Sequence, residues 1–256
     1  MKAKLTVIKV GGKIVEEESS LQRLLDDFAA IEGYKVLVHG GGRSATKIAS
    51  QLGIESQMVN GRRITDAETL KVVTMVYGGL VNKNIVAGLQ ARNINAVGLT
   101  GADMNVILSD KRPVKDIDYG FVGDVKQVDG ERLASLIQSG IVPVMAPLTH
   151  DGKGNILNTN ADTIAGETAK GLASFFDVTL IYCFEKKGVL RDEADDDSVI
   201  TEISRQQFAE LVEQGVIQGG MIPKLENAFQ AIDAGVSQVI ITSASAINGN
   251  QGTKIR

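Results

Sequence analysis

Three consecutive glycines, Gly40 to Gly42, lie between an apolar run at 36–39 and a helical pattern at 43–51. Backbone N–H groups beside glycine can approach a charged oxygen closely, and the N-terminus of the following helix adds partial positive charge. A tight turn without a ligand needs only one glycine, and further glycines cost conformational entropy. The triplet therefore favours an anion-binding site at the end of a strand.

A lysine and a second glycine loop come earlier in the chain. Lys9 stands inside the apolar run 5–10, which is followed by Gly11 and Gly12. Lysine is rarely buried unless it is paired, so this run is either a solvated edge strand or a strand that places the Lys9 ammonium in a site. The adjacent glycines favour the site, because they leave room beside the ammonium.

Leu21, Leu24, Leu25 and Phe28 recur at helical spacing between these two apolar runs. The order strand, helix, strand predicts two parallel strands joined by a right-handed crossover. Ligands of such sheets bind outside the carboxyl ends of the strands, where both glycine loops are expected to lie.

Gly40, Gly42 and Ala45 also match the permissive dinucleotide-binding fingerprint, so a nicotinamide-dependent oxidoreductase is one alternative. That fingerprint needs an acidic residue about 20 positions further on, at the end of the next strand. Arg62 and Arg63 stand in this region instead. Arginine forks suit carboxylates and phosphates, so the pair favours a second anion over a ribose.

The second half of the chain carries polar residues at the starts of predicted helices. Asn158, Asn160 and Asp162 precede or begin an apolar helical run. One of these residues can cap the helix, which leaves two for a ligand. Lys224 stands at the start of another predicted helix, where a cation opposes the helix dipole unless an anion is bound.

The remaining elements alternate along the chain. Strands are predicted at 96–101, 141–147, 177–183 and 236–242, and helices at 66–93 with an interruption at Gly78-Gly79, 130–140, 206–214 and 225–234. Pro143 and Pro147 predict that their strand lies at a sheet edge or ends there, and the apolar run 177–183 predicts a central parallel strand. Segment 103–128 predicts a β-hairpin that could act as a lid.

Composition restricts the class of protein. A chain of 256 residues can form one large α/β domain or two lobes, with 145–154 as the best boundary. The net charge of −4 gives no reason to expect nucleic acid or an anionic membrane as a partner, and no apolar run reaches the length of a membrane span. The single cysteine, Cys183, excludes an intrachain disulfide, so a cytoplasmic location is expected; the two histidines are too few to favour a zinc or copper site.

These features favour an anionic ligand. The sequence has neither the Walker phosphate-binding loop nor the serine elbow of hydrolases. Phosphoryl transfer needs neither motif, since its catalysis rests on positioning and charge stabilisation. Lysines, backbone N–H groups and a magnesium ion can supply both.

Five motifs, in the same order and at matching spacing across the chain, resemble the amino acid kinase family. They are the segments 7–12, 38–42, 60–63, 158–162 and 220–224. The resemblance implies a three-layer αβα sandwich around a mostly parallel central sheet, the α/β fold that carbamate kinases share. It also implies an N-terminal lobe at 1–150 for an acylated amino acid and for dimerisation, and a C-terminal lobe at 151–256 for ATP.

Segments 60–63 and 158–162 most resemble the members that phosphorylate the side-chain carboxylate of an N-acyl-L-glutamate in arginine biosynthesis. This implies a small-molecule substrate, with ATP and Mg²⁺ as cofactors. The acyl group is acetyl or succinyl; Lys111 and Arg112 are candidates for contacting a second carboxylate. Another kinase of the family and a non-catalytic anion- or effector-binding protein on the same fold are the alternatives.

The resemblance also assigns roles to residues. Implied catalytic residues are Lys9 and Lys224, which would neutralise the transferring phosphoryl group, and Asp162, which would hold both lysines. Implied substrate-binding residues are Gly41, Gly42, Arg63 and Asn158. Implied nucleotide-binding residues are Gly11, Gly12, Glu185, Lys186, Lys187, Gly188, Val189, Leu190, Val216, Ile217 and Gln218. No protein metal ligand is implied.

Two departures from the family pattern matter. The family usually has Ser/Thr-Asp near Glu185 and an uncharged residue near Lys187, so the nucleotide contacts of this segment are not fixed by the resemblance. Members inhibited by arginine carry an additional N-terminal helix that builds a hexamer, whereas this sequence begins at its first strand. A homodimer that is insensitive to arginine is therefore expected.

Overall fold

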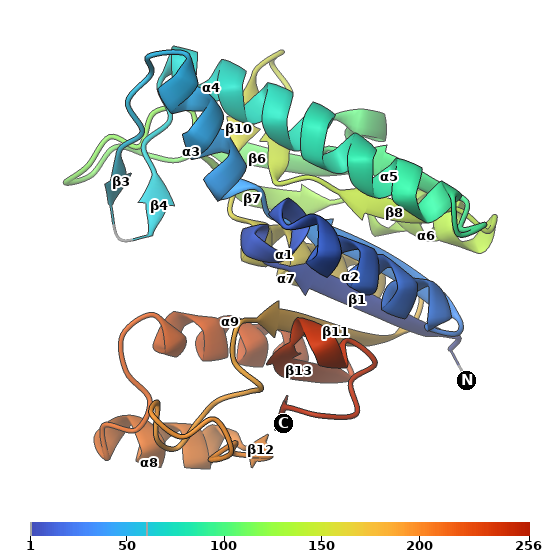
Figure 1. Cartoon of the computed structure of the whole chain (residues 1–256), viewed down its shortest axis with the longest axis vertical. Helices are drawn as coiled ribbons and strands as arrows, with labels where there is room; N and C mark the ends of the chain where they lie inside the picture. The colour runs from blue at the N-terminus through green and yellow to red at the C-terminus, as the bar shows by residue number, and fades with distance from the viewer. Residues whose placement is uncertain (1, 60) are drawn as a thin grey trace.

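Eight strands form the central sheet of the computed structural model, which describes residues 2–59 and 61–256 (Figure 1). Asn60 of the motif at 60–63 lies outside the described residues. The strands, in their order across the sheet, are β12 (Glu202–Ile203), β14 (Thr253–Ile255), β13 (Gln238–Ser243), β11 (Asp177–Phe184), β1 (Lys4–Val10), β2 (Tyr34–His39), β8 (Val142–Met145) and β5 (Ala96–Leu99). Neighbouring strands are parallel except β13 and β14.

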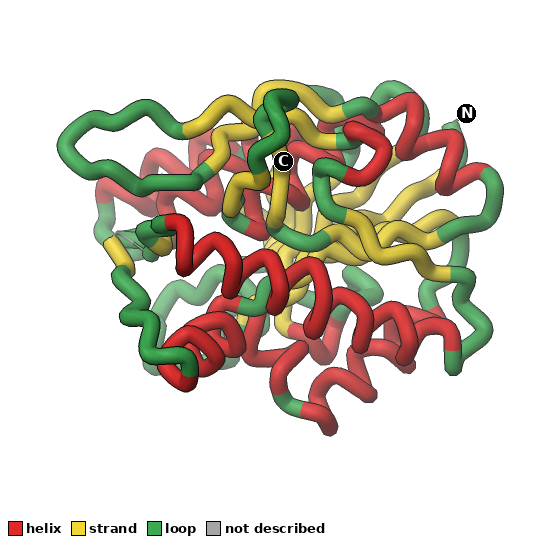
Figure 2. Tube along the Cα trace, turned by 90° about the horizontal axis from the view of Figure 1, so that it is seen from above, coloured by secondary structure: helices red, strands yellow, loops and turns green. Residues whose placement is uncertain are grey.

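Helices cover both faces of this sheet (Figure 2). One layer consists of α1 (Gly12–Glu16), α2 (Glu18–Ala30), α3 (Gly42–Gln51), α4 (Ala67–Val73), the π-helix η1 (Thr74–Val81), α5 (Asn82–Gln90) and the 3-10 turn η3 (Ala244–Ala246). The other consists of α6 (Gly130–Gln138), α7 (Ala161–Leu172), α8 (Arg205–Glu213) and α9 (Met221–Asp233). Each layer packs its own apolar cluster against the sheet, which confirms the predicted three-layer α/β architecture.

Two smaller β structures lie outside the central sheet. The four-stranded sheet has the order β10 (Ile156–Asn158), β9 (Leu148–His150), β6 (Ile107–Lys111) and β7 (Gly123–Val128), and the ribbon pairs β3 (Met58–Val59) with β4 (Arg62–Arg63). The short helix η2 (Asp103–Asn105) precedes β6. Antiparallel β6 and β7 confirm the predicted hairpin at 103–128, and Figure 1 shows its loop projecting from the body of the molecule.

Of the two positions predicted for the prolines, a sheet edge or a strand end, the structure has the strand end, since Pro143 is the second residue of β8 and Pro147 lies beyond its last residue, Met145. β8 lies between β2 and β5. Val142 and Ala146 donate hydrogen bonds to carbonyls on the β5 side, so the Pro143 nitrogen faces β2. Pairing with β2 begins only at Val144, where no N–H from Pro143 is needed.

Gly78 and Gly79 do not break the helix at 66–93, contrary to the interruption that the sequence predicted there. α4, η1 and α5 follow one another without a gap, and both glycines lie inside the π-helical turns. By length and composition alone, Ala67–Gln90 could span a membrane: its most apolar stretch has a mean hydropathy of 1.3 and is 44% buried. Val73, Val76 and Ile85 of this helix belong to the apolar core, and core helices of folded proteins pass the same test.

A buried polar network holds the first glycine of the triplet. His39 is completely buried; its Nδ1 lies 2.7 Å from the Gly40 carbonyl oxygen and its Nε2 3.1 Å from Nδ2 of Asn82. The Asn82 amide also donates to the Val144 carbonyl. A neutral ring that donates from Nδ1 and accepts at Nε2 satisfies both contacts. Burial lowers the pKa of His39 to about 4, so the ring is neutral near pH 7.

This network makes stability sensitive to acid. Because the folded pKa of His39 lies below its unfolded value near 6.5, the unfolded state binds more protons as pH falls. The neutral His39 ring contributes about 3 kcal/mol to the free energy of unfolding above pH 6.5. This contribution is lost as the pH falls from 6.5 to about 4. The difference in unfolding free energy between wild type and His39→Asn should narrow by that amount in urea titrations, whereas a His150→Gln control keeps the wild-type acid response. An unchanged difference would contradict a neutral buried His39.

Candidate active site

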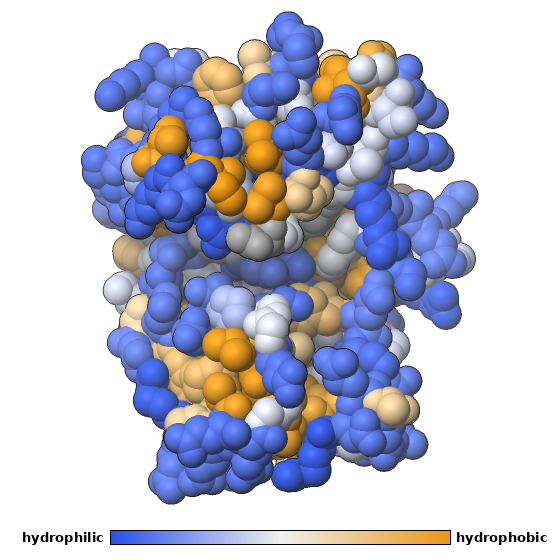
Figure 3. Space-filling view, turned by 90° about the vertical axis from the view of Figure 1, so that its left-hand side faces the viewer, coloured by the Kyte–Doolittle hydropathy of each residue, from blue (hydrophilic) through white to orange (hydrophobic). Residues whose placement is uncertain are grey.

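Two adjoining cavities lie at the carboxyl ends of the central strands. The arginine pocket, of about 200 Å³, is lined by residues that include Gly41, Arg62, Arg63, Arg112 and Asn158. The glycine pocket, of about 440 Å³, is lined by residues that include Gly11, Gly12, Arg43, Phe184 and Glu185. Gly42 and Arg63 line both cavities, so the two pockets meet at the glycine triplet. Figure 3 shows the corresponding face, which is hollowed between its upper and lower halves.

Lys9 is buried and paired, as the sequence predicted for a lysine directed into a site. Its Nζ lies 2.7 Å from Oδ1 of Asp162, in the first turn of α7. The side chains of Lys9 and Asp162 are only 10% and 23% exposed. The hydroxyl of Tyr182 donates to the Asp162 carbonyl oxygen, which ties the start of α7 to β11. The pair thus joins β1 to a helix of the opposite half of the chain.

Lys224 and Lys9 both lie over the ring of Phe184. Nζ of Lys224 is 3.9 Å from the ring centroid, and that of Lys9 is 5.0 Å from it. Burial lowers the pKa of Lys224, the Asp162 charge opposes this shift, and the Lys9 charge adds to it. The predicted catalytic residues Lys9, Lys224 and Asp162 are therefore brought together. Phe184 was missed; its position at the carboxyl end of the predicted strand 177–183 was the available signal.

The two glycine loops pack backbone against backbone. The Gly40 N–H donates to the Val10 carbonyl at 3.1 Å, and a Cβ at Gly40 would lie only 3.1 Å from the Gly12 nitrogen. A Cβ at Gly41 would lie 3.0 Å from the ring of Tyr77, which projects from η1. Gly42 has more room, since the nearest atom to a Cβ there is 3.9 Å away. Backbone N–H groups of both loops consequently border the space between the pockets.

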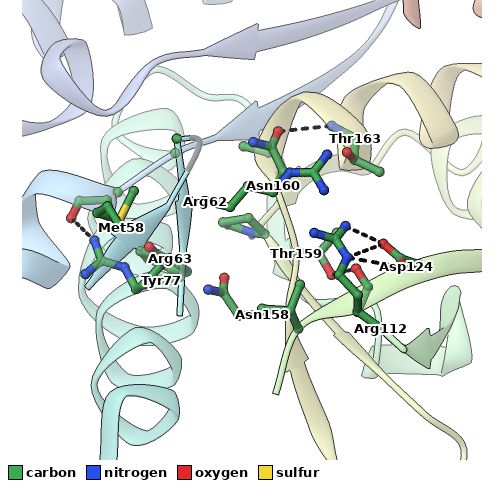
Figure 4. Close-up of a pocket in the computed structure, with 18 residues that line it drawn as sticks. Met58, Arg62, Arg63, Tyr77, Arg112, Asp124, Asn158, Thr159, Asn160 and Thr163 are labelled. Atoms are coloured by element: carbon green, nitrogen blue, oxygen red, sulfur yellow. Dashed lines mark hydrogen bonds and ion pairs between the residues drawn. The ribbon is translucent and has the colours of Figure 1, made fainter. Parts of the chain in front are cut away.

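Arg63 is held in a fixed orientation rather than extended into solvent. One terminal nitrogen donates to the Ser56 hydroxyl at 2.7 Å, and the other donates to the Gly42 carbonyl and the Thr46 hydroxyl at 2.8 Å each. Figure 4 shows it beside Tyr77 on the wall formed by β4 and η1. The sequence indicated the arginine but not these partners.

The three polar residues before α7 divide their roles as the sequence predicted. Asn160 caps the helix through its side-chain oxygen, which accepts from the N–H groups of Asp162 and Thr163. Asn158 donates to the Thr65 hydroxyl and lines the arginine pocket. Asp162 pairs with Lys9. Asn160 is therefore the helix cap, and Asn158 and Asp162 are left for other contacts.

Two further arginines border the arginine pocket. Arg112 forks toward the carboxylate of Asp124, but its Nη1 is buried without a partner among the described residues (Figure 4). Arg62 is exposed at the mouth of the pocket. The ammonium of Lys111, in contrast, lies over the ring of Phe121, and Lys111 is not among the residues that line the pocket. Positive charge is thus concentrated at one end of this cavity.

Glu185 joins the two halves of the glycine pocket. One of its carboxylate oxygens lies 3.5 Å from Nζ of Lys13 and 3.6 Å from Nη2 of Arg43. All three side chains are more than half exposed, so these contacts stabilise the fold little. These contacts do hold Lys13 and Arg43 beside the glycine loops. The sequence analysis did not identify these two cations as site residues.

The other residues that the resemblance assigns to the nucleotide, at 186–190 and 216–218, lie in the carboxyl-terminal half of the chain. Lys186 and Lys187 are exposed and pair with Asp196 and Asp197. Gly188, Val189 and Leu190 pack toward β14 or the core; the Val189 N–H donates to the Thr253 hydroxyl. Val216, Ile217 and Gln218 form the turn between α8 and α9, with Ile217 buried. Of all the residues assigned to the nucleotide, Gly11, Gly12 and Glu185 line the glycine pocket.

The donor set fits a nucleotide better than a protein-held metal. In the described part of the chain, no cluster of three or more His, Cys, Asp or Glu side chains could hold an ion. Asp162, the carboxylate closest to both lysines, is already paired. Mg²⁺ commonly keeps several waters and binds through substrate phosphates, so phosphate oxygens rather than side chains would hold it here.

Two lysines over one aromatic ring that lines the glycine pocket are suited to a phosphotransferase that works without a Walker loop. The model of the amino acid kinase family matches residues 4–243, and the chain belongs to this family. It is an enzyme of the phosphotransferase class.

Known proteins support this assignment. An acetylglutamate kinase of Phocaeicola vulgatus is 79% identical over 256 residues, 100% of both chains. The structure of smu.665 from Streptococcus mutans has a TM-score of 0.80 at 29% identity and covers 98% of each chain. A carbamate kinase of Giardia lamblia, with a TM-score of 0.70 at 17% identity over 99% of this chain and 98% of that one, has the same fold. The fold class and the family expected from the sequence are therefore confirmed.

The lysine arrangement predicts the effect of removing one charge. Lys224→Ala should fold normally but lose kcat by a factor of about 100 to 1,000, the range seen when one charge-stabilising donor is deleted. Because the pKa of Lys224 is lowered, the wild-type kcat should also fall on the alkaline side before pH 10.5. Initial rates from pH 6 to 10 measure both effects. Lys153→Ala, in the exposed β9–β10 turn, is the matched control; near wild-type turnover of Lys224→Ala would remove Lys224 from the mechanism.

Proposed function

We propose that this protein transfers the γ-phosphoryl group of ATP to the side-chain carboxylate of N-acetyl-L-glutamate in arginine biosynthesis. The observation that carries the proposal is the placement of Lys9 and Lys224 over the ring of Phe184, which lines the glycine pocket. The relative from Phocaeicola vulgatus, named acetylglutamate kinase, is identical at 79% of positions over its whole length. A kinase of this chemistry must bring together two negatively charged reactants, and the site supplies the positive charge between them.

The reaction needs charge stabilisation more than a base. A side-chain carboxylate is ionised at neutral pH, so its oxygen can attack the γ-phosphorus without losing a proton. The new bond joins that oxygen to phosphorus, and the bond from phosphorus to the β–γ bridging oxygen breaks, which releases ADP. Lys9 and Lys224 would neutralise the phosphoryl oxygens, and N–H groups of the glycine loops would orient them. His39, completely buried behind Gly40, takes no part in the chemistry.

The arginine pocket would receive the acylglutamate. Arg63 and Asn158 line it, and the N–H groups of Gly41 and Gly42 border it. Acetyl is the proposed acyl group, after the name of the relatives. Succinyl is the second candidate, because Arg62 and Arg112 line the same cavity and suit a further carboxylate.

The glycine pocket would receive the phosphates of ATP with Mg²⁺. Gly11, Gly12 and Glu185 line it, and Lys13 and Arg43 add positive charge. The remaining assigned nucleotide contacts, at 186–190 and 216–218, would lie along the base and ribose. The acylglutamate would then lie mainly against residues 1–150, with Asn158 added from the other half. ATP would contact residues 151–256 and, through its phosphates, the glycine loops of residues 1–150. Buried Cys183, whose pKa is raised by burial, is in keeping with a cytoplasmic location.

We also propose a homodimer. Met75 and Leu80, in the mostly apolar π-helix η1, are 56% and 49% exposed. A second copy of the chain that covers this face would remove both side chains from water.

The activity is tested by ADP release in the presence of ATP and Mg²⁺. N-acetyl-L-glutamate should support turnover, and free L-glutamate and L-aspartate should not, because they lack the acyl group. N-succinyl-L-glutamate as a parallel substrate identifies the acyl preference through kcat/KM. Folded protein that binds ATP but turns over none of these substrates would favour the non-catalytic anion-binding alternative.

The dimer is tested by sedimentation velocity. Leu80→Lys should shift the protein from dimer to monomer, because a buried lysine at the interface would lose its hydration. Met104→Lys, at an exposed apolar residue outside η1, should leave the assembly unchanged. A wild-type chain that sediments as a monomer at micromolar concentration would contradict the proposal.

A further inference from the structure

The ring of Phe184 faces both lysines of the site. Nζ of Lys224 lies 3.9 Å from its centroid and Nζ of Lys9 lies 5.0 Å from it, both within the distance at which a cation is attracted to an aromatic face. Phe184 is the last residue of β11 and lines the glycine pocket. An aromatic side chain therefore stands where the lysines reach the phosphate end of the cleft.

Only one of the two lysines has a carboxylate partner among the described residues. Asp162 pairs with Lys9 at 2.7 Å. Within residues 2–59 and 61–256, no carboxylate oxygen lies within 4.0 Å of Nζ of Lys224. Lys224 is partly buried and is also repelled by Lys9. The closest counterpart of its charge is the electron-rich face of Phe184.

We propose that Phe184 is a positioning residue that holds the ammonium of Lys224, and through the same ring that of Lys9, in line with the transferring phosphoryl group. A carboxylate in this place would bind the ammonium groups more tightly, but it would also repel the phosphates of ATP. The ring attracts cations without carrying a net charge, so the Lys224 ammonium keeps its full charge for the phosphoryl oxygens. This role deepens the proposed kinase function and rests on it.

The ring is itself held in place by its neighbours. Phe184 stacks on Tyr182, with ring centroids 6.1 Å apart and an interplanar angle of 16°. Tyr182 is buried and donates through its hydroxyl to the Asp162 carbonyl. The backbone of Phe184 is paired with Ser243 of β13. The ring, the lysines and Asp162 thus form one closed set of contacts that links β1, β11, α7 and α9.

An alternative role for Phe184 is a simple apolar wall of the pocket. The two roles differ in what they require of the ring, because a wall depends on shape and a cation–π contact depends on the electron density of the face. Fluorine atoms withdraw that density while they keep the size of the ring nearly constant. Leucine keeps the apolar character but removes the face altogether.

The test replaces Phe184 with mono-, di- and trifluorinated phenylalanine and measures kcat and both KM values with ATP and the acylglutamate. We expect log kcat to fall steadily with each fluorine, and Phe184→Leu to lower kcat about tenfold. Phe184→Tyr and Phe184→Trp should retain most of the activity. KM for the acylglutamate should stay within a factor of about two, because Phe184 does not line the arginine pocket.

Controls separate this role from stability and from the proposed function. The same fluorinated residues at Phe175, an exposed position before the start of β11, should leave kcat unchanged. Urea midpoints identify any variant that loses activity through unfolding. If the variants fluorinated at Phe184 turn over at the wild-type rate, the positioning role is overturned and the kinase function is left intact. A wild-type chain without turnover would instead overturn the proposed function, as the ADP assay reveals independently.

The alkaline side of the pH profile gives a second readout. Charged groups around Lys224 are Lys9 on β1 and Asp162 on α7. Loss of the ring removes a contact that favours the ammonium over the neutral amine, so the alkaline fall in kcat should move to lower pH in Phe184→Leu. A pocket wall without electrostatic influence would leave the fall where it is in the wild type.

Discussion

The ion pair of Lys9 with Asp162 is the constraint on which the arrangement of the site depends. A lysine inside a central strand has to be paired, since an isolated buried ammonium would cost several kcal/mol. Its partner comes from the first turn of a helix more than 150 residues later in the chain. To make this contact, α7 must begin close to the carboxyl end of β1, and Asn160, which caps α7, fixes that beginning. The burial of the Lys9 charge and the packing of the two halves of the chain therefore depend on the same contact.

Much of this organisation is readable in the sequence because it follows from local rules. Glycine triplets, alternating apolar runs and helix caps predict the parallel sheet, its helices and the edge at which ligands bind. Lys9 was recognisable because a cation interrupts an apolar run, and Asp162 because one cap could not account for three polar residues. The assignment to a particular family of kinases came from the order of five motifs rather than from any one of them.

Other features could not be predicted because they depend on contacts between distant segments. Pro143 was compatible with a sheet edge or a strand end, and only the structure shows that its strand is internal and that its nitrogen faces a position where pairing has not begun. The glycines at 78 and 79 looked like a helix break but are accommodated by a π-helix. Phe184 looked like the end of a core strand, and only the positions of Lys9 and Lys224 around its ring show otherwise.

The central sheet runs without interruption from one half of the chain to the other. β1 and β11 are paired over seven residues, and the glycine pocket lies at the carboxyl ends of both strands. Two lobes joined by a flexible linker could swing apart about a hinge, but lobes that share hydrogen-bonded strands cannot. Any opening of the cleft has to be taken up as a change in the twist of the sheet.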